Sequence, residues 1–102
     1  MCEIKIGATK YKVVANLQVI DPAARGVVMG EVDYPRCLIT LLGPLNKTRK
    51  EETLIHEVLH AIFFEAGYLE HSEEMVDRLT PFLYSFIKEN NLDKLFDEVN
   101  RN

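Results

Sequence analysis

The chain has 102 residues, which fits one domain, and we expect residues 1–102 to form it. Its formal net charge is −4 and its pI is about 5.3, with no long run of lysine or arginine, so we expect no nucleic-acid partner. Cys2 and Cys37 lack a CxxC spacing, which argues against both a disulfide framework and a thiolate zinc site.

The N-terminal stretch "MCEIKIGATKYK" alternates charged with apolar residues and contains no apolar signal segment. No other stretch is apolar for long enough to span a bilayer. We therefore expect a cytoplasmic protein without a membrane partner.

The first half of the chain contains three strand-like groups of apolar residues. These groups are 3–6, 10–20 and 27–42. Gly7 marks a turn after the first group, and Asp21-Pro22 marks a connection after the second. The third group reads as one or two strands interrupted around Tyr34-Pro35, and proline within a strand run indicates an edge or a bulge.

The second half has the 3.6-residue periodicity of helices. We expect a first helix at roughly 49–66, with a capping box at Thr48-x-x-Glu51 and with Gly67 at its C-terminal end. A second helix is expected from near Ser72 to about Lys88, and Pro81 should kink or restart it.

A short final helix is expected at "LDKLFDEV", after the break at Asn90-Asn91. Strands followed by helices predict an α+β fold, with a small N-terminal antiparallel sheet preceding the helices.

The stretch "TLIHEVLHAIF" holds the residues with the clearest chemistry. His56 and His60 are four residues apart, so on a helix they are neighbours and can bind one tetrahedral zinc ion. We expect both histidines at the edge of the apolar face and Glu57 further round, toward the polar side. From there Glu57 can reach a zinc-bound water, as in the HExxH motif.

Catalytic zinc needs a third protein ligand, and "LEHSEEMVDRL" offers several. Glu73 shares a helix face with residues expected to pack on the first helix, which favours it. Glu74 and His71 are the alternatives.

"TLIHEVLHAIF" followed by "HSEEMVDRL" resembles the gluzincin metallopeptidases. More narrowly, it is similar to the very small HExxH proteins of bacteriophages and prophages called minigluzincins. The resemblance implies a minimal zincin-like fold with Glu73 as third ligand and Asp77 orienting a ligand histidine. It also implies an edge strand, for which "RCLITLL" is the candidate, that binds an extended peptide or protein substrate. A phage-encoded protein would act in the cytoplasm of the bacterial host.

The favoured function is therefore zinc-dependent peptide-bond hydrolysis with Glu57 as general base. The alternative is a zinc-containing, non-catalytic binding or regulatory module of phage origin, and a third reading is an interaction protein without metal. The pattern indicates neither substrate-binding residues nor an oligomeric state. It offers only Tyr68 and His71, by their nearness in sequence, as donors to the transition state.

Overall fold

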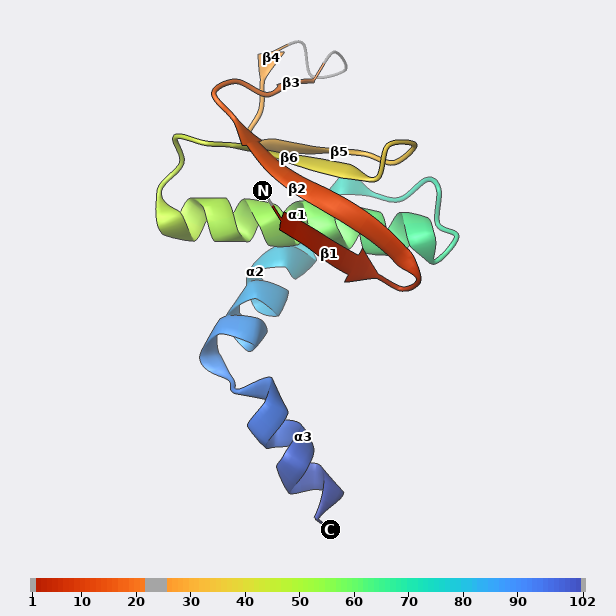
Figure 1. The fold of residues 1–102 in the computed structure, drawn as a ribbon, viewed down its shortest axis with the longest axis vertical. Helices are drawn as coiled ribbons and strands as arrows, with labels where there is room; N and C mark the ends of the chain where they lie inside the picture. The colour runs from red at the N-terminus through yellow and green to blue at the C-terminus, as the bar shows by residue number, and fades with distance from the viewer. Residues whose placement is uncertain (1, 22–25, 102) are drawn as a thin grey trace.

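A computed structural model describes residues 2–21 and 26–101. The strands are β1 (Cys2–Ile6), β2 (Thr9–Asn16), β3 (Ile20–Asp21), β4 (Gly26–Val27), β5 (Gly30–Asp33) and β6 (Leu38–Leu42). The helices are α1 (Lys47–Glu65), α2 (Glu73–Glu89) and α3 (Leu92–Asn100). The fold is α+β as predicted, and α1 lies between the sheet and α2 (Figure 1).

The main sheet has four strands in the order β1-β2-β6-β5. Strands β1 and β2 are antiparallel, as are β5 and β6, but β2 and β6 run parallel. The sheet is therefore mixed, and the expectation of an antiparallel sheet was wrong. The parallel pairing results from the path of the chain. After β2 the chain forms the separate β3–β4 pair and the edge strand β5, and it then returns as β6 beside β2 in the same direction.

The edge strand nearest the helices is β5, not the "RCLITLL" segment. The apolar run Leu38–Leu42 forms β6 and lies in the interior of the sheet, with its middle residues buried. A mostly apolar run suits a strand that has a neighbouring strand on each edge. Tyr34-Pro35 belongs to the turn between β5 and β6.

Two turns were expected before β5. Gly7 has the positive φ of 61° that the tight β1–β2 turn requires, and glycine adopts it at no steric cost. The connection expected at Asp21-Pro22 lies partly outside the described residues, which omit 22–25.

The core lies between the sheet and α1. One cluster of buried side chains combines residues of β2 and β6 with Ile6 and Ala61. The residues from β2 and β6 are Tyr11, Val13, Ile39 and Leu41. The Tyr11 hydroxyl donates to Glu65 Oε2 at 2.8 Å, and Thr9 donates to Glu65 Oε1 at 2.7 Å. These bonds connect β2 to the last turn of α1.

Helix α1 begins earlier than predicted. Asn46, not Thr48, is the N-cap, and its side chain accepts a hydrogen bond from the backbone of Arg49 at 2.8 Å. Asparagine caps as well as threonine, so the helix begins at the earlier residue. The predicted end is confirmed, because Gly67 has φ of 98°. Tyr68 N–H donates to Phe63 carbonyl at 2.8 Å, which completes a Schellman motif.

The predicted start of α2 is confirmed, because Ser72 caps the helix through the backbone N–H of Met75 at 3.2 Å. The helix continues through Pro81 to Glu89, so Pro81 does not start a new helix. Helix α3 follows the predicted break with Asn91 as its cap, and it lies farthest from the sheet (Figure 1). None of the helices in the described ranges has the length and apolarity needed to cross a membrane.

Candidate metal centre

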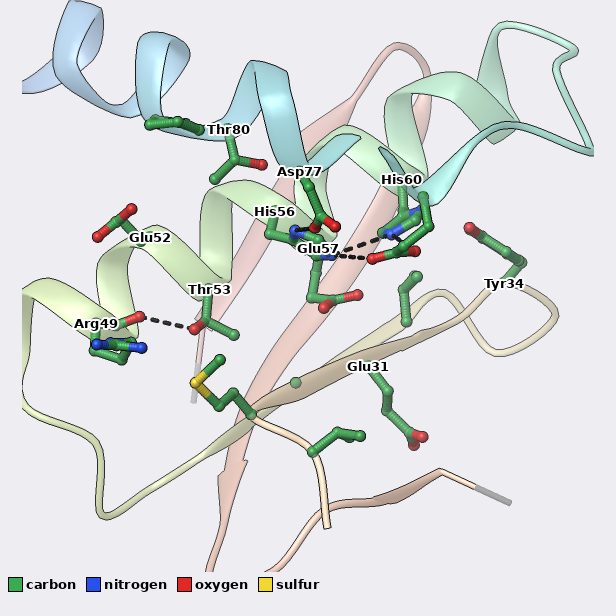
Figure 2. Close-up of a pocket in the computed structure, with 16 residues that line it drawn as sticks. Glu31, Tyr34, Arg49, Glu52, Thr53, His56, Glu57, His60, Asp77 and Thr80 are labelled. Atoms are coloured by element: carbon green, nitrogen blue, oxygen red, sulfur yellow. Dashed lines mark hydrogen bonds and ion pairs between the residues drawn. The ribbon is translucent and has the colours of Figure 1, made fainter. Parts of the chain in front are cut away.

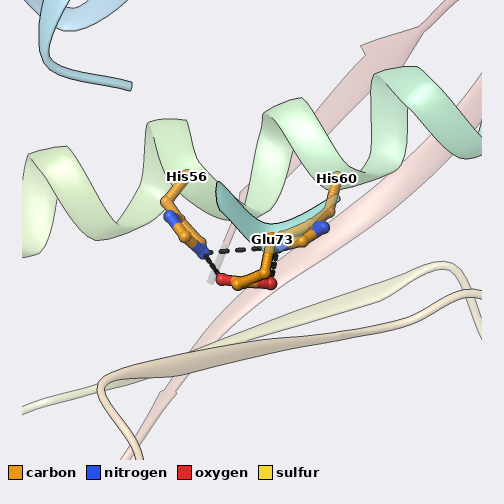
Figure 3. Close-up of side chains that lie close together, drawn as sticks. All are labelled: His56, His60 and Glu73. Carbon is orange, nitrogen blue, oxygen red and sulfur yellow. Dashed lines mark hydrogen bonds and ion pairs between the residues drawn. The ribbon is translucent and has the colours of Figure 1, made fainter. Parts of the chain in front are cut away.

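His56, His60 and Glu73 come together where α1 and α2 meet (Figure 3). The two histidines lie one turn apart on α1, and Glu73 is the first residue of α2. The turn that follows α1 reverses the chain, so the start of α2 lies against the middle of α1 (Figure 1). Local capping at Gly67 and Ser72 thus positions the third side chain.

The spacing of the three side chains suits one metal ion. His56 Nε2 and His60 Nε2 are 3.3 Å apart. Two nitrogens bound tetrahedrally to zinc at 2.0–2.1 Å would be about 3.3 Å apart. The Glu73 carboxylate oxygens lie 2.8 Å from His56 Nε2 and 3.0 Å from His60 Nε2. These three groups therefore lie close enough together to bind one metal ion.

The partners of His71 indicate which ring nitrogen of His60 carries the proton. His71 Nδ1 lies 2.8 Å from the Tyr68 carbonyl oxygen, which can only accept, so the His71 proton is on Nδ1. His71 Nε2 is then an acceptor, and it lies 2.7 Å from His60 Nδ1. His60 Nδ1 donates this bond, and the neutral ring is left with a lone pair on Nε2.

Asp77 lies across the ring of His56 from Glu73. Its Oδ1 lies 3.4 Å from His56 Nδ1 and can only accept when ionised. Glu73 Oε1 lies closer, 2.8 Å from His56 Nε2, so each ring nitrogen of His56 faces a carboxylate that can accept its proton. A cation bound at Nε2 would take the place of a proton there and leave the ring proton on Nδ1, facing Asp77.

The surroundings of His60 favour its neutral form. Its side chain is only 12% exposed. Burial lowers the pKa of His60, Glu73 opposes this shift, and the neighbouring His56 and His71 add to it. Neutral imidazole is the form that binds metal, so His60 needs no deprotonation at neutral pH.

Glu57 is buried, and it lies on the sheet side of α1 rather than toward the polar side as we expected. The difference arises because α1 is covered on two sides, by the sheet and by α2. Figure 2 shows the Glu57 carboxylate turned toward β5, next to the histidines. Glu57 thus faces the same open space as the candidate metal ligands.

The other predicted residues lie apart from the convergence point. Glu74 is exposed and pairs with Arg78 at 3.1 Å. His71 contacts the far nitrogen of His60, so its place is behind a ligand rather than among the ligands. Tyr68 is 62% exposed, and its ring packs edge-on against Phe63.

A cleft of about 890 Å³ lies between β5 and the two helices. Its walls include the metal-centre residues, Glu57 and Tyr34 (Figure 2). Gly30 lets β5 approach α1 closely, since a Cβ there would lie 2.7 Å from Thr53 Cγ2. No local sequence pattern points to Tyr34 or Gly30 as site residues, because only the β5–β6 pairing brings them to α1.

Comparison of the chain with protein-family models, with curated proteins and with solved structures gave no match. The candidate centre therefore rests on its own residues and their geometry.

Proposed function

We propose that this chain is a zinc-dependent metallopeptidase. The observation that carries the proposal is the convergence of His56, His60 and Glu73 beside buried Glu57, in one cleft next to an edge strand.

The donor set favours zinc. Two imidazoles and one carboxylate form a common protein ligand set of catalytic zinc and leave a position for water or substrate. When bound in such a site, zinc polarises a carbonyl and lowers the pKa of water. Metals that prefer all-oxygen ligands, such as magnesium and calcium, fit these nitrogens less well.

The protein's own groups supply the remaining chemistry. Glu57 takes the proton of the attacking water and gives it to the leaving nitrogen. Its buried position holds the carboxylate in place. With zinc held at Nε2, Asp77 and His71 would accept the Nδ1 protons of His56 and His60 and so orient the two imidazoles.

The substrate in this proposal is an extended peptide or a protein segment. Within the described part of the chain, β5 is hydrogen-bonded to β6 on one side and forms the edge of the sheet on the other. A peptide added to that edge would pass through the cleft beside Glu57.

A zinc-containing binding module without catalysis is the second candidate, and one observation favours it. Met75, Leu79, Phe82 and Phe86 are 43–78% exposed and lie on one face of α2. An apolar stripe of this kind suits contact with another protein. Such a module would bind zinc and hydrolyse nothing.

The test is a peptidase assay on a quenched-fluorescent peptide library, comparing zinc-loaded wild type with Glu57→Gln. We expect wild type to cleave a subset of peptides, and Glu57→Gln to keep its zinc while losing activity by about 100-fold or more. Equal cleavage by the two proteins, at equal metal content, would refute Glu57 as the base. A zinc-loaded wild type that cleaves no peptide would favour the binding module.

A further inference from the structure

Tyr34 is the one tyrosine that lines the described cleft, and its ring is fixed there. The ring stacks on Phe64 with centroids 4.2 Å apart and planes within 5°. Phe64 lies one helical turn after His60 on α1, so the stacked ring lies beside the metal centre. Figure 2 shows the hydroxyl end of Tyr34 turned toward His60.

The backbone of Tyr34 is held by the turn between β5 and β6. Its carbonyl accepts a hydrogen bond from Cys37 N–H at 3.1 Å, and Asp33 Oδ1 accepts one from Arg36 N–H at 3.2 Å. Cys37 adopts a positive φ of 51° in this turn. The hydroxyl is thus positioned before any substrate arrives, which is what stabilisation of developing charge requires.

The charges around Tyr34 keep its hydroxyl protonated. Burial raises the pKa of Tyr34, and the carboxylates of Glu57 and Glu73 raise it further. Near neutral pH the hydroxyl is therefore a hydrogen-bond donor. Tyr34, Glu57 and Glu73 all line the same cleft.

We infer that the Tyr34 hydroxyl donates a hydrogen bond to the oxygen of the scissile carbonyl as that oxygen becomes negatively charged. This inference rests on the proposed peptidase function. The water oxygen bonds to the carbonyl carbon, the carbon–nitrogen bond breaks, and the water proton passes through Glu57 to the leaving nitrogen. Tyr34 keeps its own proton throughout and stabilises the oxyanion.

The two donors considered from sequence fit this role less well. Tyr68 is 62% exposed and lies outside the cleft lining. Both ring nitrogens of His71 are already engaged, with His60 and with the Tyr68 carbonyl.

The test uses zinc-loaded Tyr34→Phe, which keeps the ring and its stacking on Phe64. We expect kcat to fall by about 100-fold, the usual cost of one oxyanion donor, with little change in KM. A second measurement is the affinity for a phosphinic pseudopeptide, whose anionic tetrahedral centre mimics the charged carbonyl oxygen. Calorimetry should show a loss of about 30- to 100-fold with unchanged zinc content. Tyr68→Phe is the matched control: it removes only an exposed hydroxyl outside the cleft lining, keeps the backbone carbonyl that contacts His71, and should match wild type in both measurements.

The outcomes separate this inference from the function on which it rests. An active wild type, with Tyr34→Phe at wild-type kcat and phosphinate affinity, would overturn the role of Tyr34 and leave the peptidase proposal standing. A wild type that holds zinc but neither cleaves peptides nor binds the phosphinate would overturn the proposed function, and the role of Tyr34 with it.

Discussion

His71 Nε2 lies 2.7 Å from His60 Nδ1, on the side of the imidazole opposite to Glu73. His71 Nδ1 lies 2.8 Å from the Tyr68 carbonyl oxygen, which can only accept, so this backbone group favours a neutral His60 whose proton is on Nδ1 and whose lone pair is on Nε2. We therefore expect His71 to position a ligand, although the sequence also allowed it as a ligand itself.

Replacing His71 with phenylalanine should weaken zinc binding without abolishing it. The aromatic ring can keep the stacking on Phe63, but it cannot accept the His60 proton. Loss of such an orienting partner lowers metal affinity by about 10- to 100-fold. Competition with a chromophoric chelator measures the affinity, and nitrogen NMR of the imidazoles reports the His60 tautomer. An unchanged affinity and tautomer would show that His71 only packs.

The ligand set predicts a clear pattern of metal content. Protein purified without chelator should hold about one zinc per chain, as a single site requires. His60→Ala and Glu73→Ala should lose most of it, because each removes one of three converging donors. Glu74→Ala is the matched control, since Glu74 is adjacent in sequence but pairs with Arg78. Elemental mass spectrometry measures the content, and loss of zinc in Glu74→Ala alone would assign the third ligand to Glu74.

The predictable part of the site was the part that depends on local sequence. The i, i+4 spacing makes His56 and His60 neighbours on any helix. Gly67 and Ser72 end one helix and begin the next, and these two signals placed Glu73 at a helix start.

The rest depends on pairing between distant segments. The position of β6 inside the sheet, parallel to β2, results from long-range packing that no local pattern encodes. Tyr34 reaches the cleft because β5 forms the edge. The periodicity of α1 predicts one apolar face with Glu57 toward the polar side, whereas α1 is covered by both the sheet and α2.

The metal-free protein should lose stability as the pH falls below neutrality. Burial lowers the folded-state pKa of His60 below the ordinary value of 6.5, with Glu73 opposing and with His56 and His71 contributing. As the pH falls through 6.5, the unfolded chain therefore takes up a proton before the folded chain does. The free energy of unfolding should decrease in this window until the pH passes the folded-state pKa.

Urea unfolding in the presence of chelator, from about pH 7.5 to about pH 5.5, measures this loss around the ordinary imidazole pKa. His60→Gln removes the titrating imidazole, so its free energy of unfolding should depend less steeply on pH. Identical slopes for the two proteins would exclude His60 as the source.

Gly30 allows close contact between β5 and α1, and alanine there should be destabilising. The new Cβ would lie 2.7 Å from Thr53 Cγ2 and 3.3 Å from Glu57 Cγ. Thr53 cannot turn away freely, because its hydroxyl donates to the Arg49 carbonyl at 2.7 Å. Overpacking of this kind costs about 1–3 kcal/mol, and it should also displace Glu57 and reduce any peptidase activity.

Two further variants separate this clash from a general effect of alanine in the chain. Gly43→Ala should change stability little, because its Cβ would approach nothing closer than the Asn16 carbonyl oxygen at 3.4 Å. Thr53→Ser removes Cγ2 while keeping the hydroxyl, so it should restore much of the stability when combined with Gly30→Ala. Chemical denaturation of wild type, Gly30→Ala, Thr53→Ser and the double variant completes a double-mutant cycle. Simple additivity of the Gly30 and Thr53 substitutions would show that their contact is not what makes glycine necessary in β5.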